Sequence, residues 1–194
     1  MLKVVSTIAF LAVSAFAIHT GELNINDTDL EVGVKLDVGQ FNDATEPNTM
    51  FIGAKYLGAD KGHSDNTNTE LDPMFEGNFL VMREIGDKGL SLGMGAKYKY
   101  TKDFSALPLG LELGYKIPAT DLVPMSINGA LYYAPKVLCF ENGKDFTSYR
   151  IYYDVEPIEN AIITLGYRSL NLTQNTGGSF NYNSSWYFGF KVNF

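Results

Sequence analysis

The sequence predicts an all-β protein: a transmembrane, antiparallel, up-and-down β-barrel of ten strands, with eight strands as the alternative. The strongest observation is the alternation in the last eleven positions, where almost every second side chain is large and apolar. The chain also contains 12 Tyr, 13 Phe and 19 Gly residues, a composition that favours strands and tight turns. A terminal strand with one apolar face that ends on Phe194 is typical of the closing strand of an outer-membrane barrel.

The first 17 residues are predicted to be a cleaved secretory signal. Lys3 supplies a positive charge, an apolar stretch follows it, and Ala15-Phe16-Ala17 matches a small-x-small cleavage site. The apolar stretch is shorter than the roughly 20 residues that a membrane-spanning helix needs. The outer-membrane barrel domain is therefore predicted to occupy residues 18–194.

Nine segments alternate with a period of two residues, as strands with one apolar and one polar face do. In chain order they cover residues 30–38, 50–56, 75–81, 90–100, 107–117, 123–133, 148–156, 163–168 and 184–194. Their lengths suit the roughly 9–11 residues that a tilted membrane strand requires. A barrel with both ends in the periplasm needs an even number of strands, so the weakly alternating segment 20–26 is predicted to be the first strand.

The connections between these segments alternate in length. Short connections at residues 84–89, 118–122 and 156–160 are predicted to be periplasmic turns. Longer, polar connections at residues 59–72, 134–144 and 170–183 are predicted to be external loops, and only 101–105 is short for an external position. Pro108 lies inside the fifth segment, where it is tolerated near a strand start or at a bulge.

The apolar face of each strand is predicted to contact lipid, and the polar face to line the interior. A soluble barrel would also alternate, but its apolar face would point inward. Here the apolar face carries too many large residues for the inside of a small barrel, whereas Gly, Ser, Asn and charged residues suit a narrow lumen. Tyrosines gather near the segment ends, where membrane girdles lie. They are Tyr56, Tyr98, Tyr100, Tyr115, Tyr133, Tyr149 and Tyr167.

Charged residues of both signs lie on the predicted lumen face. The candidate lumen charge network comprises Lys35, Glu76, Lys97, Lys99, Glu112, Lys116, Arg150, Asp154, Arg168 and Lys191. Glu31, Asp37, Lys55 and Glu156 face the same way. In a small barrel such charges usually pair and fill the interior, because an unpaired buried charge is unfavourable. The alternative is a narrow polar conduction path.

No catalytic, cofactor or metal site is predicted, and the chain is predicted not to be an enzyme. Two histidines are present, and His63 lies in the loop sequence Gly62-His63-Ser64-Asp65. Consecutive loop residues seldom hold the mutual orientation that a nucleophilic triad needs. Acidic residues of the same loop offer oxygen ligands for calcium, but their spacing matches no EF-hand pattern. They are Asp60, Asp65, Glu70 and Asp72.

The formal net charge of −7 and the absence of a Lys/Arg cluster argue against a nucleic-acid partner. Cys139 is the only cysteine, so an internal disulfide is excluded. The expected partners are outer-membrane lipid and the barrel-assembly machinery. The spacing of Tyr187, Gly189, Val192 and Phe194 resembles the terminal signal that this machinery reads.

Several stretches resemble the YfaZ family of small outer-membrane proteins. They are residues 105–110 (SALPLG), 132–140 (YYAPKVLCF), 160–170 (NAIITLGYRSL) and 188–194 (FGFKVNF). The resemblance implies a Gram-negative outer-membrane barrel and brings no established activity and no catalytic residues. Together these observations predict a structural or accessory envelope protein. The alternatives are a narrow channel for small polar solutes or ions and, less favoured, an envelope enzyme with His63 as its base.

Overall fold

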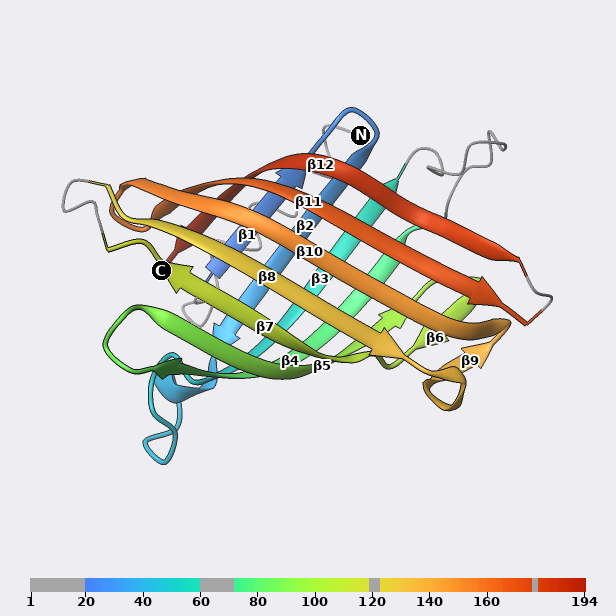
Figure 1. Ribbon diagram of the computed structural model, residues 1–194, viewed down its shortest axis with the longest axis horizontal. Coiled ribbons are helices and arrows are strands. Elements are labelled where there is room, and N and C mark those ends of the chain that lie inside the picture. The colour runs from blue at the N-terminus through green and yellow to red at the C-terminus, as the bar shows by residue number, and fades with distance from the viewer. Residues whose placement is uncertain (1–19, 60–71, 119–122, 176–177) are drawn as a thin grey trace.

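The computed structural model describes residues 20–59, 72–118, 123–175 and 178–194. Within them, ten strands form a closed antiparallel barrel (Figure 1). They are β1 (Thr20–Ile25), β2 (Asp29–Asp37), β3 (Met50–Ala59), β4 (Met74–Ile85), β5 (Leu90–Tyr100), β7 (Leu109–Lys116), β8 (Met125–Ala134), β10 (Gly143–Ile158), β11 (Ala161–Gln174) and β12 (Ser179–Asn193). The predicted signal and His63 lie outside the described residues.

The barrel closes through its first and last strands. β1 pairs antiparallel with β12, from Thr20 opposite Asn193 to Ile25 opposite Phe188. β4 pairs with β5, and every other wall strand pairs with its neighbours in the wall, so no edge of the ten-strand sheet is left open. The prediction of ten strands, with segment 20–26 as the first, is confirmed.

The two ends of the barrel differ, and we name them by their residues. Thr20 and Asn193 lie at the terminal end, together with the 3-10 helix η1 (Val38–Gln40). The opposite, loop end carries the short strands β6 (Phe104–Ala106) and β9 (Cys139–Glu141), which pair with each other beyond β5, and the 3-10 helix η2 (Lys136–Leu138). These additions cover part of the loop end (Figure 1).

Three strands extend further toward the loop end than the alternation predicted. β10, β11 and β12 continue their ladder up to the pairs of Gly143 with Gln174 and of Thr173 with Ser179. The predicted loop at 170–183 is therefore mostly strand, and only residues 175–178 connect the two strands. The outward residues there are polar, so the apolar alternation stops although the backbone hydrogen bonds continue. Pro108 precedes β7, and its carbonyl accepts a hydrogen bond from Lys97 N at 2.9 Å.

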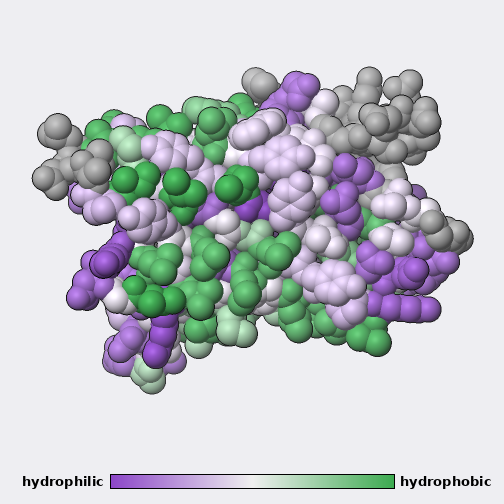
Figure 2. Space-filling view, in the orientation of Figure 1, coloured by the Kyte–Doolittle hydropathy of each residue, from purple (hydrophilic) through white to green (hydrophobic). Residues whose placement is uncertain are grey.

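The apolar faces of the strands point away from the barrel axis. Leu111 is 49% exposed and Phe188 is 53% exposed, whereas Arg168 on the inner face is 2% exposed. Figure 2 shows apolar side chains gathered over the middle of the wall and hydrophilic ones toward the two ends. Among the described residues, no helix has the length and apolar character to cross a membrane. The wall itself presents the outward apolar band that a bilayer requires.

Aromatic side chains on the outer face form a girdle toward the loop end. Tyr56 packs edge-on against Phe75 with ring centroids 5.1 Å apart, and Tyr167 packs edge-on against Trp186 at 5.4 Å. Further members are Tyr98, Tyr100, Tyr133 and Tyr149, all exposed. Such amphipathic rings are enriched where a membrane meets water.

One inward glycine makes room for a lumen aromatic. The ring of Tyr132 lies across Gly110, where a Cβ atom would come within 2.5 Å of the ring. The two residues are cross-strand partners on β7 and β8. Tyr132 thereby lies flat against the wall and is 1% exposed, which leaves the centre of the lumen to the charged side chains.

Candidate functional site: the barrel interior

The interior of the barrel is divided along its axis into three layers. An apolar plug lies at the loop end, a layer of paired charges lies in the middle, and a polar cavity lies toward the terminal end. The side chains at the inward positions of the wall strands form these layers. They are apolar near the loop end, charged in the middle and polar toward the terminal end.

The apolar plug is made where inward positions near the loop end become hydrophobic. Phe104 from β6 packs against Phe146 from β10, with ring centroids 5.8 Å apart. The other buried members are Leu57, Met74, Ala106, Ala134, Cys139, Leu170, Leu172 and Tyr182. The plug therefore joins the wall strands to the short strands β6 and β9 and closes the lumen at this level.

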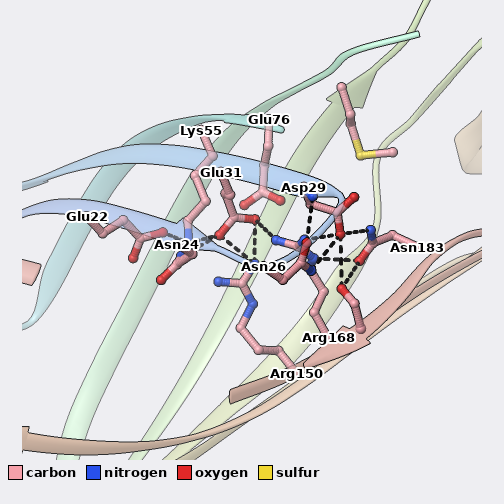
Figure 3. A network of polar contacts seen from close by, with 12 residues as sticks. Glu22, Asn24, Asn26, Asp29, Glu31, Lys55, Glu76, Arg150, Arg168 and Asn183 are labelled. Atoms are coloured by element: carbon pink, nitrogen blue, oxygen red, sulfur yellow. Dashed lines mark hydrogen bonds and ion pairs between the residues drawn. The ribbon is translucent and has the colours of Figure 1, made fainter. Parts of the chain in front are cut away.

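The charge layer is organised around the carboxylate of Glu31 on β2 (Figure 3). Arg150 donates to both carboxylate oxygens, at 2.9 and 2.7 Å, and Arg168 donates to Oε2 at 2.8 Å. Asn24 donates to Oε1 at 2.8 Å, and the ammonium of Lys55 lies 3.7 Å away. A buried carboxylate is stable when several charged donors satisfy its lone pairs, as they do here.

Arg168 extends this network toward the loop end. Its Nε donates to Asn183 at 2.9 Å, and its Nη2 donates to Asp29 at 3.3 Å. Asn183 and Ser185 also donate to Asp29, at 2.5 and 3.1 Å. The guanidinium therefore ties β2 to β11 and β12 at the point where the short β1 ends.

A second cluster surrounds Glu76 on β4, which β3 separates from β2. Lys99 lies 2.6 Å from Glu76, and Lys97 lies between Glu76 at 3.8 Å and Glu112 at 3.2 Å. Tyr132 donates to Glu112 at 2.7 Å, and the ammonium of Lys97 lies 3.9 Å from the centroid of the Tyr132 ring. Both clusters carry charges of opposite sign in direct contact, so this layer is largely compensated.

A third group lies nearer the terminal end. Lys191 on β12 donates to both carboxylate oxygens of Asp154 on β10, at 3.0 and 2.8 Å. Thr164 and Asn128 also donate to Asp154, at 2.5 and 3.3 Å. The ammonium of Lys191 lies 4.2 Å from the centroid of the Tyr152 ring.

A cavity of about 320 Å³ lies below the charge layer. Thr20 and Asn193 at the terminal end line it, and so does Asn48, which is exposed. The cavity is therefore continuous with that side of the barrel. A separate space of about 20 Å³ lies between the charge layer and the plug, which is room for about one water molecule.

The structure places nine of the ten predicted network residues inside the barrel, and Lys116 outside it. Lys116 pairs with Glu84 at 2.7 Å at the exposed terminal end. β7 ends at Lys116, so its inward position there is already beyond the enclosed lumen. The alternation missed Glu22, Asp29 and Asn183, which have the same inward parity as their predicted neighbours.

The four residues of the predicted assembly signal do not share a face. Tyr187 points inward and its ring lies 5.3 Å from the guanidinium carbon of Arg150, and Gly189 also faces the lumen. Val192 lies on an outward position of the same strand, and Phe194, one residue beyond the end of β12, is exposed.

No group of His, Cys, Asp and Glu residues in the described part of the chain is arranged to hold a metal ion. Asp60, Asp65 and Glu70, considered above as calcium ligands, lie outside the described residues.

A closed ten-strand antiparallel barrel with an apolar exterior, an aromatic girdle and a charged interior defines an outer-membrane β-barrel protein. Among solved structures, the chain is similar to LpxR from Salmonella typhimurium, with a TM-score of 0.47 and 10% sequence identity over 86% of this chain and 73% of that chain. No protein-family model matches the sequence, and no curated protein matches it.

This comparison corrects one prediction. LpxR is an enzyme with a barrel fold, which contradicts the inference that a barrel of this kind has no enzymatic activity, so the prediction that the present chain is not an enzyme is withdrawn. A β-barrel framework supports catalysis as well as transport or structural roles, because chemistry depends on local side chains rather than on the fold. No activity is carried over from LpxR to this chain.

Proposed function

We propose that the protein is a closed outer-membrane barrel of the Gram-negative envelope with a structural or accessory role, and that its lumen is reached from the periplasm. In this proposal the terminal end faces the periplasm and the loop end faces outward, as the short turns after β4 and β10 favour. The YfaZ resemblance, secretion by the N-terminal signal and insertion by the barrel-assembly machinery through the terminal signal belong to the same proposal, the signal comprising Tyr187, Gly189, Val192 and Phe194.

The observation that carries this proposal is the apolar plug at the loop end. Phe146 and Ala134 are fully buried, and Phe104 is buried next to them. Ions and small polar solutes do not cross a close-packed apolar layer, because their desolvation there is strongly unfavourable. The charge layer beneath is also filled by side chains that are already paired with one another.

A narrow channel for small polar solutes or ions is the second candidate, and the cavity of about 320 Å³ favours it. That cavity occupies the terminal half of the lumen and is lined by polar and charged groups, as a conduction path would be. Conduction through the whole barrel would require the plug around Phe146 to move away from the axis.

Planar-bilayer recording separates these two candidates. Purified, folded protein should insert without producing steady current steps, whereas the double variant Phe104→Ala/Phe146→Ala should leak through the opened plug. Val137→Ala is the matched control, since Val137 is 80% exposed at the loop end and does not belong to the plug. Regular current steps from the unmodified protein would reject the closed barrel and support the channel.

A further inference from the structure

The cavity at the terminal end has a cationic surplus. Five cationic side chains line it: Lys35, Lys55, Lys97, Arg150 and Lys191. Three carboxylates line it: Glu22, Glu112 and Asp154. A surplus of positive charge in a cavity that communicates with solvent attracts anions.

Of the two surplus positive charges, one belongs to Arg150, whose partner Glu31 does not line the cavity, and the other belongs to Lys35. The other four cations each contact a carboxylate: Lys55 pairs with Glu22, Lys97 with Glu112, Arg150 with Glu31 and Lys191 with Asp154. Among the described residues, by contrast, the ammonium of Lys35 has a cation–π contact with Phe51, at 4.6 Å from the ring centroid, and no hydrogen bond or ion pair.

The residues opposite Lys35 on the two neighbouring strands supply no carboxylate to neutralise its ammonium group. Lys35 lies on β2 opposite Thr20 on β1 and Gly53 on β3, two residues that carry no charge. The three carboxylates that line the cavity are already paired with other cations: Glu22 with Lys55, Glu112 with Lys97 and Asp154 with Lys191. An ammonium in such surroundings has unused hydrogen-bond donors aimed at the cavity.

The wall beside Lys35 is apolar. Phe51 on β3 and Leu80 on β4 are both 6% exposed and point into the barrel, and Met82 lies on the same inward row as Leu80. All three line the cavity. A molecule with its anionic group at Lys35 would therefore lay an apolar or aromatic body against this wall.

We propose that this cavity is a binding site for a small organic anion, whose carboxylate or phosphate accepts from Lys35 while its apolar body packs against Phe51, Leu80 and Met82. A volume of about 320 Å³ lies at the small end of the range of ligand pockets. The inference rests on the proposed function to the extent that the ligand enters from the periplasmic side of a closed barrel.

Equilibrium dialysis of labelled benzoate against the folded barrel in lipid nanodiscs tests the site, with empty nanodiscs as the baseline. Benzoate should bind saturably at one site per barrel, with a Kd of about 1 mM or below. Benzamide, which has the same shape without the charge, should not bind. Inorganic phosphate, which has the charge without the body, should bind at least tenfold more weakly, as expected when an apolar contact is missing.

Variants assign the binding to Lys35. Lys35→Met should weaken benzoate binding about tenfold or more, the effect of losing one charge-assisted hydrogen bond, and Lys35→Arg should restore it. Lys116→Met is the matched control, because Lys116 lies at the same end of the barrel but outside the cavity. Each variant must retain its heat-dependent shift on a gel, and if Lys35→Met does not fold, Lys35→Gln replaces it.

Three results would overturn the site: no saturable benzoate binding, equal binding by Lys35→Met, or equal binding of phosphate and benzoate. None of these three results would count against the proposed function, which is tested by conduction. Dialysis does not register conduction, so a conducting barrel that binds benzoate would reject the closed barrel alone. A non-conducting barrel that does not bind benzoate would reject the anion site alone.

Discussion

Glu31 and Arg168 are joined across the lumen, with Nη1 of Arg168 2.8 Å from Oε2 of Glu31, although 137 residues separate them in the sequence. β1 and β12 stand between their strands in the wall. The contact therefore spans the interior rather than following one strand pair. The contact holds the short β1–β2 hairpin against the long strands β11 and β12. The charge layer therefore stabilises the barrel wall as well as filling the lumen.

The first prediction concerns this contact between Glu31 and Arg168. Arg168→Met should lower the free energy of unfolding by about 3–5 kcal/mol, because it leaves the buried carboxylates of Glu31 and Asp29 without one of their charged partners. Urea unfolding of the barrel in lipid vesicles, followed by the gel shift, measures the loss.

The control for this prediction is an ion pair in water. Lys116→Met breaks the exposed pair with Glu84 and should change stability by less than about 1 kcal/mol. If Arg168→Met and Lys116→Met lost similar amounts of stability, the lumen network would contribute no more than a surface ion pair, and the prediction would be contradicted.

A second prediction concerns the glycine beneath Tyr132. Gly110→Ala should destabilise the barrel by about 1–3 kcal/mol, because the added methyl group would have to displace the Tyr132 ring and the wall next to it. Gly77→Ala should be close to neutral, since a Cβ atom there meets nothing within 4 Å. Comparing the two unfolding midpoints tests the packing, and equal midpoints would contradict it.

The orientation of the apolar face gives a third prediction. Leu111 lies midway along the wall and points outward between Met94 and Leu131, so Leu111→Arg should cost about 2–4 kcal/mol in a bilayer. Val137→Arg, on the exposed helix η2 at the loop end, should cost little. If Leu111→Arg were tolerated as well as Val137→Arg, then Leu111 would not face lipid.

Alternation along the strands was enough to predict the wall. Segments such as 90–100 kept one apolar and one polar face, and the even-number rule then required a strand at 20–26, which the structure contains as β1. The alternation failed toward the loop end, because Asn171, Thr173 and Ser184 are polar on the outer face although their backbones remain paired. Hydrogen bonding, rather than hydropathy, extends those strands.

The interior was predictable only in part, for a geometric reason. The alternation of inward and outward positions along each strand places Glu31, Arg150 and Arg168 on the inner face. It does not determine which charges meet across the barrel axis, because that depends on strand tilt and register. The lack of an ion pair for Lys35 likewise emerges only after the barrel has closed. Parity also could not show that β7 ends at Lys116, which places that side chain outside the lumen.

The last prediction concerns Cys139, which lies on β9 beyond the ten wall strands. The residue is 9% exposed, and its thiol donates to the carbonyl of Ala134 at 3.4 Å. Burial, with a smaller contribution from the negative charge of Asp145, raises the pKa of the Cys139 thiol. Because the thiolate is the reactive form, maleimide should label the folded protein slowly at pH 7 and faster as pH rises. In urea, labelling should become rapid at pH 7, and mass spectrometry over time gives both rates. Labelling of the folded barrel at the unfolded rate would mean that β9 does not remain packed against the plug.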